Sequence, residues 1–523
     1  MQPVLINGQW RDANAAGSFQ ATNPSTGEAL PDEYPVSTWD DCDEALSAAA
    51  GAARELAALP ASRIADFLEK YAELIEANKD QLVEMAHAET GLPKSPRLAD
   101  GELPRTTGQL RQAAAACRSG SWQLATIDTG AGIRSHYAAL GPVAVFGPNN
   151  FPFAFGSVSG GDFAAAIAAG NPVIGKANSS HPGVTRLFAE AALEAARATG
   201  LPLATVQLIY RTSHADGERL VADPRLGATG YTGSRGAGLK LKAAADAAGK
   251  PIYLELSSVN PVVLLPQAVA QRGELLADEF TGSCLMGAGQ FCTNPGLVIL
   301  CDDEPGRALV NTVAAKFSAA PTGTLLSRGV AASLHQGLQT LVDAGARVAT
   351  GHQPGDEPRI TYANTLLTIT GDQFLSDPET FQTEAFGNGS LFVLAKDAEQ
   401  MGEVLEHLEG NLTGCIYSAD DGSDDDAYDA LAPRLRRKVG RLLNDKMPTG
   451  VAVSAAMNHG GPYPATGHPG FTAVGIPASL LRFAALHCYD NVRPQRLPAS
   501  LADKNPGDMW RLVDGQWSQG DVA

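Results

Sequence analysis

The chain has 523 residues, of which 44% are hydrophobic and 18% charged, so it can bury more than one hydrophobic core and is not a disordered chain. Its 39 Lys and Arg residues against 57 Asp and Glu residues give a net charge of −18, which excludes an extended basic surface for nucleic acid. We therefore expect about two or three domains and no nucleic-acid partner.

Neither the start of the chain nor its longest uncharged segment is typical of a targeting signal or a membrane span. The first residues lack a basic stretch followed by an apolar one, and three prolines interrupt the uncharged residues between Arg134 and Asp162. The seven cysteines show no CxxC spacing, and no pair of histidines has the spacing of metal ligands. We expect a cytoplasmic protein with reduced cysteines, no membrane span and no metal site.

The first part of the chain predicts a hairpin followed by helices. Asn7-Gly8 lies between apolar residues, which is a strong signal for a two-residue hairpin turn, and residues 512–517 repeat this pattern near the other end. Residues 39–89 are rich in Ala and Glu, and between Ile64 and Ile75 the apolar side chains recur at helical spacing. We expect these helices to cover another layer of the fold.

The middle of the chain alternates short apolar runs with helical segments. The apolar runs lie at 143–146, 172–175, 205–209, 227–230, 252–256 and 262–265. Helical segments at 162–169 and 184–199 separate the first three runs. This alternation predicts a parallel sheet buried on both faces, and ligands of such sheets bind beyond the carboxyl ends of the strands.

After about residue 266 the alternation resumes and predicts a second α/β domain. Its apolar runs are 297–300, the residues around Val348, 391–394, 414–417 and 450–453.

Three segments near the ends of these runs could carry chemistry. Cys292 follows a glycine-rich turn, where backbone amides lower the pKa of a thiol and hold an oxyanion, unless it is simply a buried apolar cysteine. Glu255 ends an apolar run and either caps a helix or acts as a base. Asn149 and Asn150 lie in a rigid turn between prolines and could donate to an oxyanion.

Taken together, six motifs in this order and spacing resemble the aldehyde dehydrogenase superfamily over about residues 4–495. The motifs are Pro148-Asn149-Asn150-Phe151-Pro152, Lys176, Gly233-Ser234 with Gly238, Glu255-Leu256, Gly289-Gln290-Phe291-Cys292 and Glu384-Ala385-Phe386-Gly387. The resemblance implies an α/β fold with three parts: a Rossmann-like coenzyme-binding domain, a second α/β catalytic domain and a small β oligomerisation arm. We place the coenzyme-binding domain at 1–127 and 142–256, the catalytic domain at 257–455, and the arm with a C-terminal extension at 128–141 and 480–523.

The resemblance also implies the catalytic roles. Cys292 would attack the aldehyde carbon, and the side-chain amide of Asn150 would stabilise the oxyanion with the backbone N–H of Cys292. After hydride transfer to the nicotinamide, Glu255 would act as the general base for hydrolysis of the thioester.

Coenzyme contacts follow from the same motifs. Glu384 would hold the nicotinamide-side ribose with Phe386 beside that ring, and Lys176 would reach the adenosine ribose. Gly233 and Ser234 would open a helix whose amides face the pyrophosphate. Gly238 and Leu256 complete the set of coenzyme residues that the motifs imply.

Two positions favour NADP over NAD, although NAD is not excluded. Many NAD-specific relatives carry a Glu three residues after the lysine, whereas this chain has Ser179, which does not repel a 2′-phosphate. Arg211 follows the next predicted strand and would add a second positive charge beside Lys176, unless it is an ordinary surface charge.

Within the superfamily, the stretches 255–261, 384–390 and 459–466 resemble the branch of 2-oxoglutarate semialdehyde dehydrogenases and NADP-dependent fatty aldehyde dehydrogenases. Semialdehyde enzymes of this branch usually carry an Arg and a Ser where this chain has 470–475, Gly-Phe-Thr-Ala-Val-Gly. This departure mildly favours an apolar aldehyde, and Arg105 is an alternative residue for binding an anionic substrate, unless it is a solvated surface charge.

Phe151, Phe155 and Phe291 would line the substrate tunnel beside the thiol, unless they are simple core residues. Residues 130–136 and 489–492 resemble the superfamily's subunit-joining arms, so we expect a homodimer or a homotetramer.

Three other functions compete with NADP-dependent oxidation of an aldehyde. An acylating dehydrogenase would lack the water-activating Glu255. A cysteine hydrolase needs a histidine beside Cys292, and no motif places one there. A binding protein on an inactive enzyme fold would not be expected to retain Cys292, Glu255 and Asn150 together.

Overall fold

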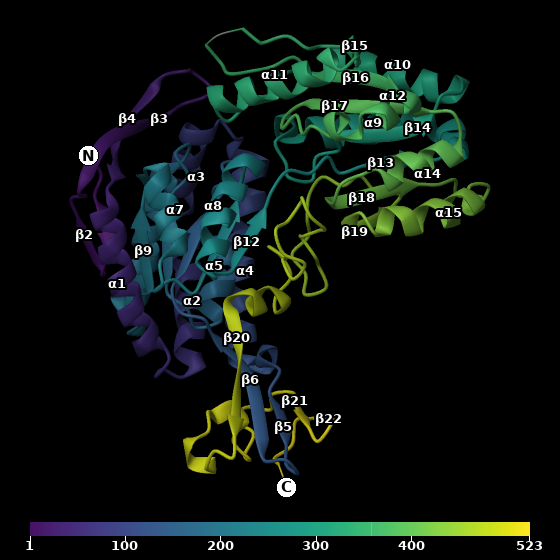
Figure 1. Ribbon diagram of the computed structural model, residues 1–523. Helices are drawn as coiled ribbons and strands as arrows, with labels where there is room; N and C mark the ends of the chain where they lie inside the picture. The colour runs from purple at the N-terminus through teal and green to yellow at the C-terminus, as the bar shows by residue number, and fades with distance from the viewer. Residues whose placement is uncertain (357, 523) are drawn as a thin grey trace.

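In the residues that the structure describes, 1–356 and 358–522 of a computed structural model, four β-sheets organise the chain. Two seven-stranded sheets with helices packed against them form the two large bodies in Figure 1, and a small five-stranded sheet projects from them at the bottom of the view. A three-stranded sheet lies near the N-terminus, with the strand order β10 (Arg211–Thr212), β4 (Ala29–Ser37) and β3 (Ala15–Thr22).

The first large sheet has a parallel core. Its strand order is β12 (Ile252–Glu255), β11 (Ala228–Thr232), β7 (Val143–Phe146), β8 (Val173–Lys176), β9 (Val206–Ile209), β1 (Val4–Ile6) and β2 (Gln9–Arg11). The first five strands run parallel, and the hairpin β1–β2, with Asn7 and Gly8 at positive φ in its turn, adds antiparallel to β9. The parallel strands are short and almost completely buried, as expected for a sheet with helices on both faces.

Eight α-helices and one π-helical segment accompany this sheet in the described residues. They are α1 (Trp39–Leu56), α2 (Ala61–Ala77), α3 (Lys79–Thr90), the π-helical segment η1 (Lys94–Glu102), α4 (Leu103–Ser119), α5 (Gly161–Ala168), α6 (Pro182–Thr199), α7 (His214–Ala222) and α8 (Arg235–Ala247). The helical layer predicted at 39–89 corresponds to α1, α2 and α3, whose buried faces belong to the core around the first sheet.

The second large sheet follows the same plan. Its strand order is β15 (Arg347–Thr350), β16 (Thr365–Thr370), β17 (Gly389–Ala395), β14 (Leu297–Cys301), β13 (Val262–Leu264), β18 (Asn411–Tyr417) and β19 (Val439–Asn444), with β15 alone antiparallel. Its helices are α9 (Pro266–Leu285), α10 (Glu304–Ala319), α11 (Arg328–Asp343), α12 (Gly371–Ser376), α13 (Pro378–Phe381), α14 (Ala398–Glu406) and α15 (Asp425–Arg436). The expected α/β fold with two α/β units and a β arm is confirmed.

The small sheet forms the projecting arm. Its order is β20 (Ala484–Asp490), β6 (Ile133–Ala139), β5 (Thr126–Asp128), β21 (Arg511–Val513) and β22 (Gln516–Ser518). Figure 1 shows that β6 leaves the first body and that β20 runs back beside it, so the arm joins two segments far apart in the chain. The predicted C-terminal hairpin is β21–β22.

The register of the first sheet fixes where a ligand can bind. Glu255 pairs with Thr232, Phe146 pairs with Tyr231, and Lys176 pairs with Phe146, so the carboxyl ends of these parallel strands meet at one edge. This is the edge at which open α/β sheets bind ligands.

Two differences from the sequence prediction concern residues 450–479. Residues 450–453 form no strand, since Arg441 of β19 holds the carbonyls of Pro448 and Gly450 and the following residues leave the second sheet. Residues 456–479, which the predicted boundaries leave out, contribute Phe471 and Val474 to the core around the first sheet. None of the described helices has the length and apolar character needed to cross a membrane.

Candidate active site

Cys292 lies after a sharp turn that only glycine can form at one position. In η4 (Met286–Gly289), Gly287, Ala288 and Gly289 have φ between 56° and 69°. A Cβ on Gly289 would lie 2.0 Å from the carbonyl oxygen of Gly387, so no side chain fits there. Asn260 donates its side-chain amide to the carbonyl of Cys292 at 2.9 Å and fixes the backbone behind the thiol. The thiol is partly exposed, whereas five of the other cysteines are buried.

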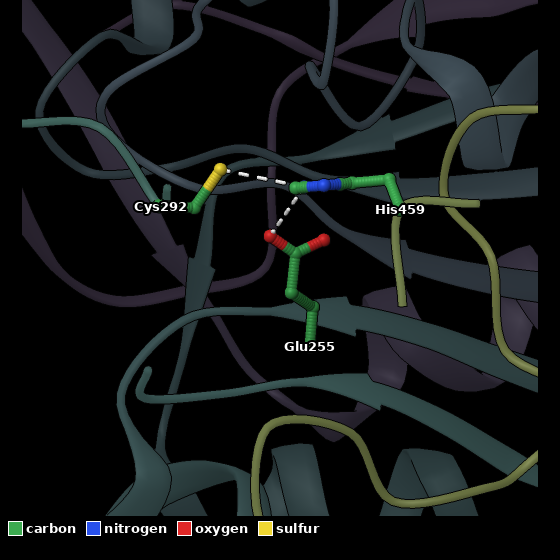
Figure 2. A group of neighbouring side chains, drawn as sticks. All are labelled: Glu255, Cys292 and His459. Carbon is green, nitrogen blue, oxygen red and sulfur yellow. Dashed lines mark hydrogen bonds and ion pairs between the residues drawn. The ribbon is translucent and has the colours of Figure 1, made fainter. Parts of the chain in front are cut away.

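Three reactive side chains meet at this point (Figure 2). The Sγ atom of Cys292 lies 3.3 Å from Nε2 of His459, and the same nitrogen lies 3.0 Å from Oε1 of Glu255. Glu255 ends β12 and His459 belongs to a loop after the second sheet, so three distant parts of the chain build the cluster. The backbone N–H of His459 donates to the Thr472 hydroxyl, and its carbonyl accepts from Ala473, which hold the imidazole in place.

Electrostatics favour a protonated imidazole. Burial lowers the pKa of His459, but the neighbouring Glu255 carboxylate and Cys292 thiol raise it to about 10. An imidazolium between the two groups stabilises both a thiolate and a carboxylate. The second oxygen of Glu255, Oε2, is buried and has no hydrogen-bond partner among the described residues.

No motif of the sequence placed a histidine near Cys292, but the structure places His459 there, so the lack of a nearby histidine no longer argues against a cysteine hydrolase. The stretch 459–466 belonged to the resemblance, but nothing in the sequence indicated that its histidine contacts a residue 167 positions away. The ligand atoms of Glu255, Cys292 and His459 all lie within 4.8 Å of one another, close enough to hold an ion. The absence of a metal site therefore stays a prediction.

Asn150 lies beside the thiol, in the loop after β7. Its side-chain amide donates to the carbonyl of Gln290 at 3.0 Å, which places it against the segment that carries Cys292. Arg97 donates to the carbonyl of Asn150 and pairs with Glu102, whose carboxylate also accepts from the backbone amides of Phe153 and Ala154. The loop is therefore tied down on both sides of Asn150.

Aromatic side chains surround the cluster. Phe151 lies 5.3 Å from both Phe155 and Phe291 between ring centroids, and Phe155 lies 5.7 Å from the His459 ring. Arg105, from α4, rests against the rings of Phe151 and Phe155. The four predicted substrate residues thus gather on one side of the thiol, and their contact with substrate stays a prediction.

All the predicted coenzyme residues except Gly238 line two adjoining pockets. One is lined by Lys176, Ser179, Arg211, Gly233 and Ser234. The other is lined by Asn150, Glu255, Leu256, Cys292, Glu384 and Phe386. Both include residues 232–234, so the pockets meet at the start of α8 and lead to the thiol.

At the far end of this groove, burial and the Arg211 guanidinium lower the pKa of Lys176 to about 8. At the near end, burial raises the pKa of Glu384 to about 7 despite hydrogen bonds from Ser257 and Ser258. Gly238 lines neither pocket. A Cβ there would lie 2.5 Å from Leu256, so this glycine lets α8 pack closely on β12 instead.

Sequence comparison identifies the family. The Aldehyde dehydrogenase family profile matches residues 10–454. The chain belongs to this family. It is therefore an oxidoreductase that acts on aldehydes, in a family that uses NAD or NADP.

Two curated relatives cover nearly the whole chain. Alpha-ketoglutaric semialdehyde dehydrogenase 2 of Azospirillum brasilense is 40% identical over 517 residues, 96% of this chain and 97% of that protein. Alpha-ketoglutaric semialdehyde dehydrogenase of Acinetobacter baylyi is 37% identical over 532 residues, 98% of each.

Solved structures share the fold at lower identity. A mutant of aldehyde dehydrogenase C from Pseudomonas syringae, in complex with NAD+ and octanal, has a TM-score of 0.79 at 18% identity and covers 95% of this chain and 98% of its own. NADP-dependent glyceraldehyde-3-phosphate dehydrogenase from Bacillus halodurans, in complex with NADP, has a TM-score of 0.77 at 20% identity, with coverage of 94% and 99%.

Proposed function

We propose that this enzyme oxidises 2-oxoglutarate (α-ketoglutarate) semialdehyde to 2-oxoglutarate, with NADP as the electron acceptor and Cys292 as the nucleophile. The observation that carries the reaction type is the cluster of Cys292, His459 and Glu255 at the end of a pocket that Glu384 and Phe386 also line. The names of the two curated relatives support the substrate.

The first step is attack of the Cys292 sulfur on the aldehyde carbon. The imidazolium of His459, 3.3 Å from Sγ, favours the thiolate, which is the reactive form. The carbonyl oxygen becomes negatively charged as the C–S bond forms. The backbone N–H of Cys292 and the side-chain amide of Asn150, which also donates to the carbonyl of Gln290, would stabilise this charge.

NADP bound in these pockets would supply the hydride acceptor that allows the adduct to become a thioester. The lining residues fit this coenzyme. Lys176, Arg211 and Ser179 supply two positive charges and a hydroxyl for a 2′-phosphate, although the carboxylate of Glu218 also lines this pocket. The first turn of α8 has no side-chain cap, so its amides are available for the pyrophosphate. Glu384 would hold the ribose next to the nicotinamide.

Hydrolysis of the thioester completes the cycle. Oε2 of Glu255 is buried and unpaired among the described residues, so it can accept a proton from water as the water attacks the thioester carbonyl. The C–S bond then breaks, the carboxylate leaves, and the sulfur returns as thiolate beside His459. In total, aldehyde, water and NADP+ give carboxylate, NADPH and two protons.

The test is NADPH formation at 340 nm from 2-oxoglutarate semialdehyde, with decanal as the apolar alternative. Cys292→Ala should abolish NADPH formation, and Cys488→Ala, which alters an exposed cysteine in the arm, should not. Glu255→Ala should release about one NADPH per active site and then stall, since the thioester forms but is not hydrolysed. Near-normal turnover by Cys292→Ala would refute the nucleophile, and loss of the burst in Glu255→Ala would contradict a role limited to hydrolysis.

A further inference from the structure

Arg105 is a half-buried arginine without a carboxylate partner in the described residues. It lies in the first turn of α4, and Nη1 donates to the carbonyl of Val451 at 2.5 Å. Nε and Nη2 are buried and have no hydrogen-bond partner among the described residues. A buried polar N–H without a partner is costly, and a buried unpaired charge more so. The molecule thus keeps two free donors of one planar guanidinium out of water.

Arg97, the other arginine at this aromatic cluster, differs from Arg105 in how its charge is compensated, although its Nε is also buried without a partner among the described residues. It also rests on the aromatic cluster, with Cζ 4.2 Å from the Phe151 ring centroid. However, Arg97 pairs with the buried carboxylate of Glu102 and donates to the carbonyl of Asn150. Its charge is compensated and its donors position the oxyanion residue, whereas the charge of Arg105 is not compensated.

The Arg105 guanidinium lies one aromatic ring away from His459 of the reactive cluster. Its Cζ is 5.3 Å from the centroid of the Phe155 ring, which in turn is 5.7 Å from the ring of His459. Burial lowers the pKa of Arg105, and the charges that act most strongly against this include those of Cys292, Glu102 and Glu255. The guanidinium is therefore within electrostatic reach of the nucleophile and separated from it by aromatic side chains.

We propose that Arg105 binds the carboxylate of the substrate, and that it makes the enzyme specific for short aldehydes that carry a carboxylate at the other end. This rests on the proposed function. Two unpaired donors along one edge of a guanidinium match the two oxygens of a carboxylate. The ion pair would form in a site from which aromatic rings exclude water. An apolar aldehyde would leave the same donors buried without partners.

Arg105 would take the place of the arginine that semialdehyde enzymes of this branch carry where this chain has residues 470–475. Phe471 and Val474 of that segment are buried in the core around the first sheet, so the segment offers no charged group to a substrate. In this proposal the carboxylate-binding residue comes instead from α4, much earlier in the chain. The carbonyl of Val451 accepts a hydrogen bond from it and so positions it.

The experiment compares 2-oxoglutarate semialdehyde with pentanal, a neutral aldehyde with the same number of carbons, as substrates of the full-length enzyme with NADP. Arg105→Gln removes the charge and keeps a donor for Val451. Arg111→Gln is the matched control, because Arg111 lies on the same helix, is exposed and pairs with Glu76. We expect Arg105→Gln to lower kcat/KM for the semialdehyde by about 10- to 100-fold, the effect of losing a charge-assisted pair, and to change that for pentanal by less than about 3-fold.

Equal losses on both substrates would show that Arg105 is only structural and would overturn the proposal. So would a wild-type enzyme that oxidises pentanal as well as the semialdehyde. If Arg105→Gln does not fold, Arg105→Lys carries the same test, since a point charge replaces the fork and the semialdehyde should again lose more than pentanal. Failure of the proposed function is a different result, namely no NADPH from either aldehyde with the wild-type enzyme.

Discussion

At the scale of single residues, the position of one imidazole decides how the thiol reacts. His459 contacts both Cys292 and Glu255 through the same nitrogen, so only one N–H is available to the two acceptors. A positive charge at that position satisfies both electrostatically, which is why its pKa is raised although burial acts against the charge.

We therefore predict that His459→Gln lowers the alkylation rate of Cys292 by iodoacetamide at pH 7 by about 10-fold or more, because the neutral amide does not stabilise a thiolate. The difference from wild type should shrink as the pH rises toward about 10, where His459 loses its proton. Labelling read by mass spectrometry at each pH gives the rates. An unchanged rate at pH 7 would show that His459 does not control the thiol.

Lys176 and Arg211 carry the coenzyme preference. Because the pKa of Lys176 is lowered to about 8, its charge is present below that pH and is lost as the pH rises through it. We predict that kcat/KM for NADP falls between pH 7 and pH 9 more steeply than that for NAD. Arg211→Ala should raise the KM for NADP about 10-fold, and that for NAD much less. Parallel pH profiles and equal KM changes for the two coenzymes would remove the argument for NADP.

At the scale of elements, the turn η4 connects α9 to the strand that follows Cys292. Its last three residues, 287–289, have positive φ in succession. The backbone of Gly387, beside Glu384 and Phe386, packs directly on Gly289. The nucleophile and the nicotinamide side of the groove are therefore held by one close backbone contact.

Gly289→Ala should push the turn that carries Cys292 away from the segment around Gly387. An L-residue at φ 69° raises the free energy of the folded state by about 1–2 kcal/mol. The new Cβ would also lie 2.0 Å from the carbonyl oxygen of Gly387. We predict a lower thermal transition temperature and a loss of activity at temperatures where the fold persists. Gly282→Ala, in α9 with no atom near the new Cβ, should keep wild-type activity and should not lower the transition temperature, because Ala is the better helix former. A Gly289→Ala enzyme with normal activity would mean that the turn can shift freely.

The sequence predicted those elements whose signals are local. Short apolar runs indicated β7, β11 and β12 to within two residues, because parallel strands buried on both faces are apolar throughout. The strand β19 was missed because only two of its six residues are buried and Arg441 lies within it, so it shows no buried apolar run.

The same limit applies to the site. Cys292, Glu255 and Asn150 follow turns or strand ends that a local pattern marks, and the structure brings them together. His459 lies in a loop without periodicity, and its contact with Cys292 spans 167 positions, so only the tertiary fold reveals it. Gly238 illustrates the reverse case, since a glycine in a coenzyme motif serves helix packing rather than the pocket wall.

At the scale of the whole molecule, the reactive cluster joins the two large bodies. Glu255 comes from the edge of the first sheet, Cys292 from the segment between α9 and β14 of the second, and His459 from the chain that returns to the first body. The backbone N–H of Leu256 donates to the carbonyl of Ala465, which ties this returning chain to the end of β12. Closure of the cluster thus depends on how the two bodies pack together.

The projecting arm has features that are expected at an interface between subunits. β20 lies at the edge of the small sheet, so one side of its backbone has no partner among the described strands, and edges of this kind can pair with other chains. Leu486 on β20 is 58% exposed, and Ile133, Trp510 and Trp517 on or beside the same sheet are exposed as well. An arm that projects from the body with apolar side chains on its surface is suited to bind a second copy of the chain.

We predict that the wild-type protein sediments as a dimer or tetramer and that Leu486→Asp shifts it toward the monomer, because a carboxylate would be buried without a partner in the subunit interface. Leu275→Asp is the matched control, since Leu275 is 51% exposed on α9, away from the arm, and should leave both the assembly and the thermal transition unchanged. Sedimentation velocity of the three proteins at equal concentration measures the outcome. A monomeric wild type, or an Leu486→Asp protein that assembles normally, would show that β20 is not the subunit interface.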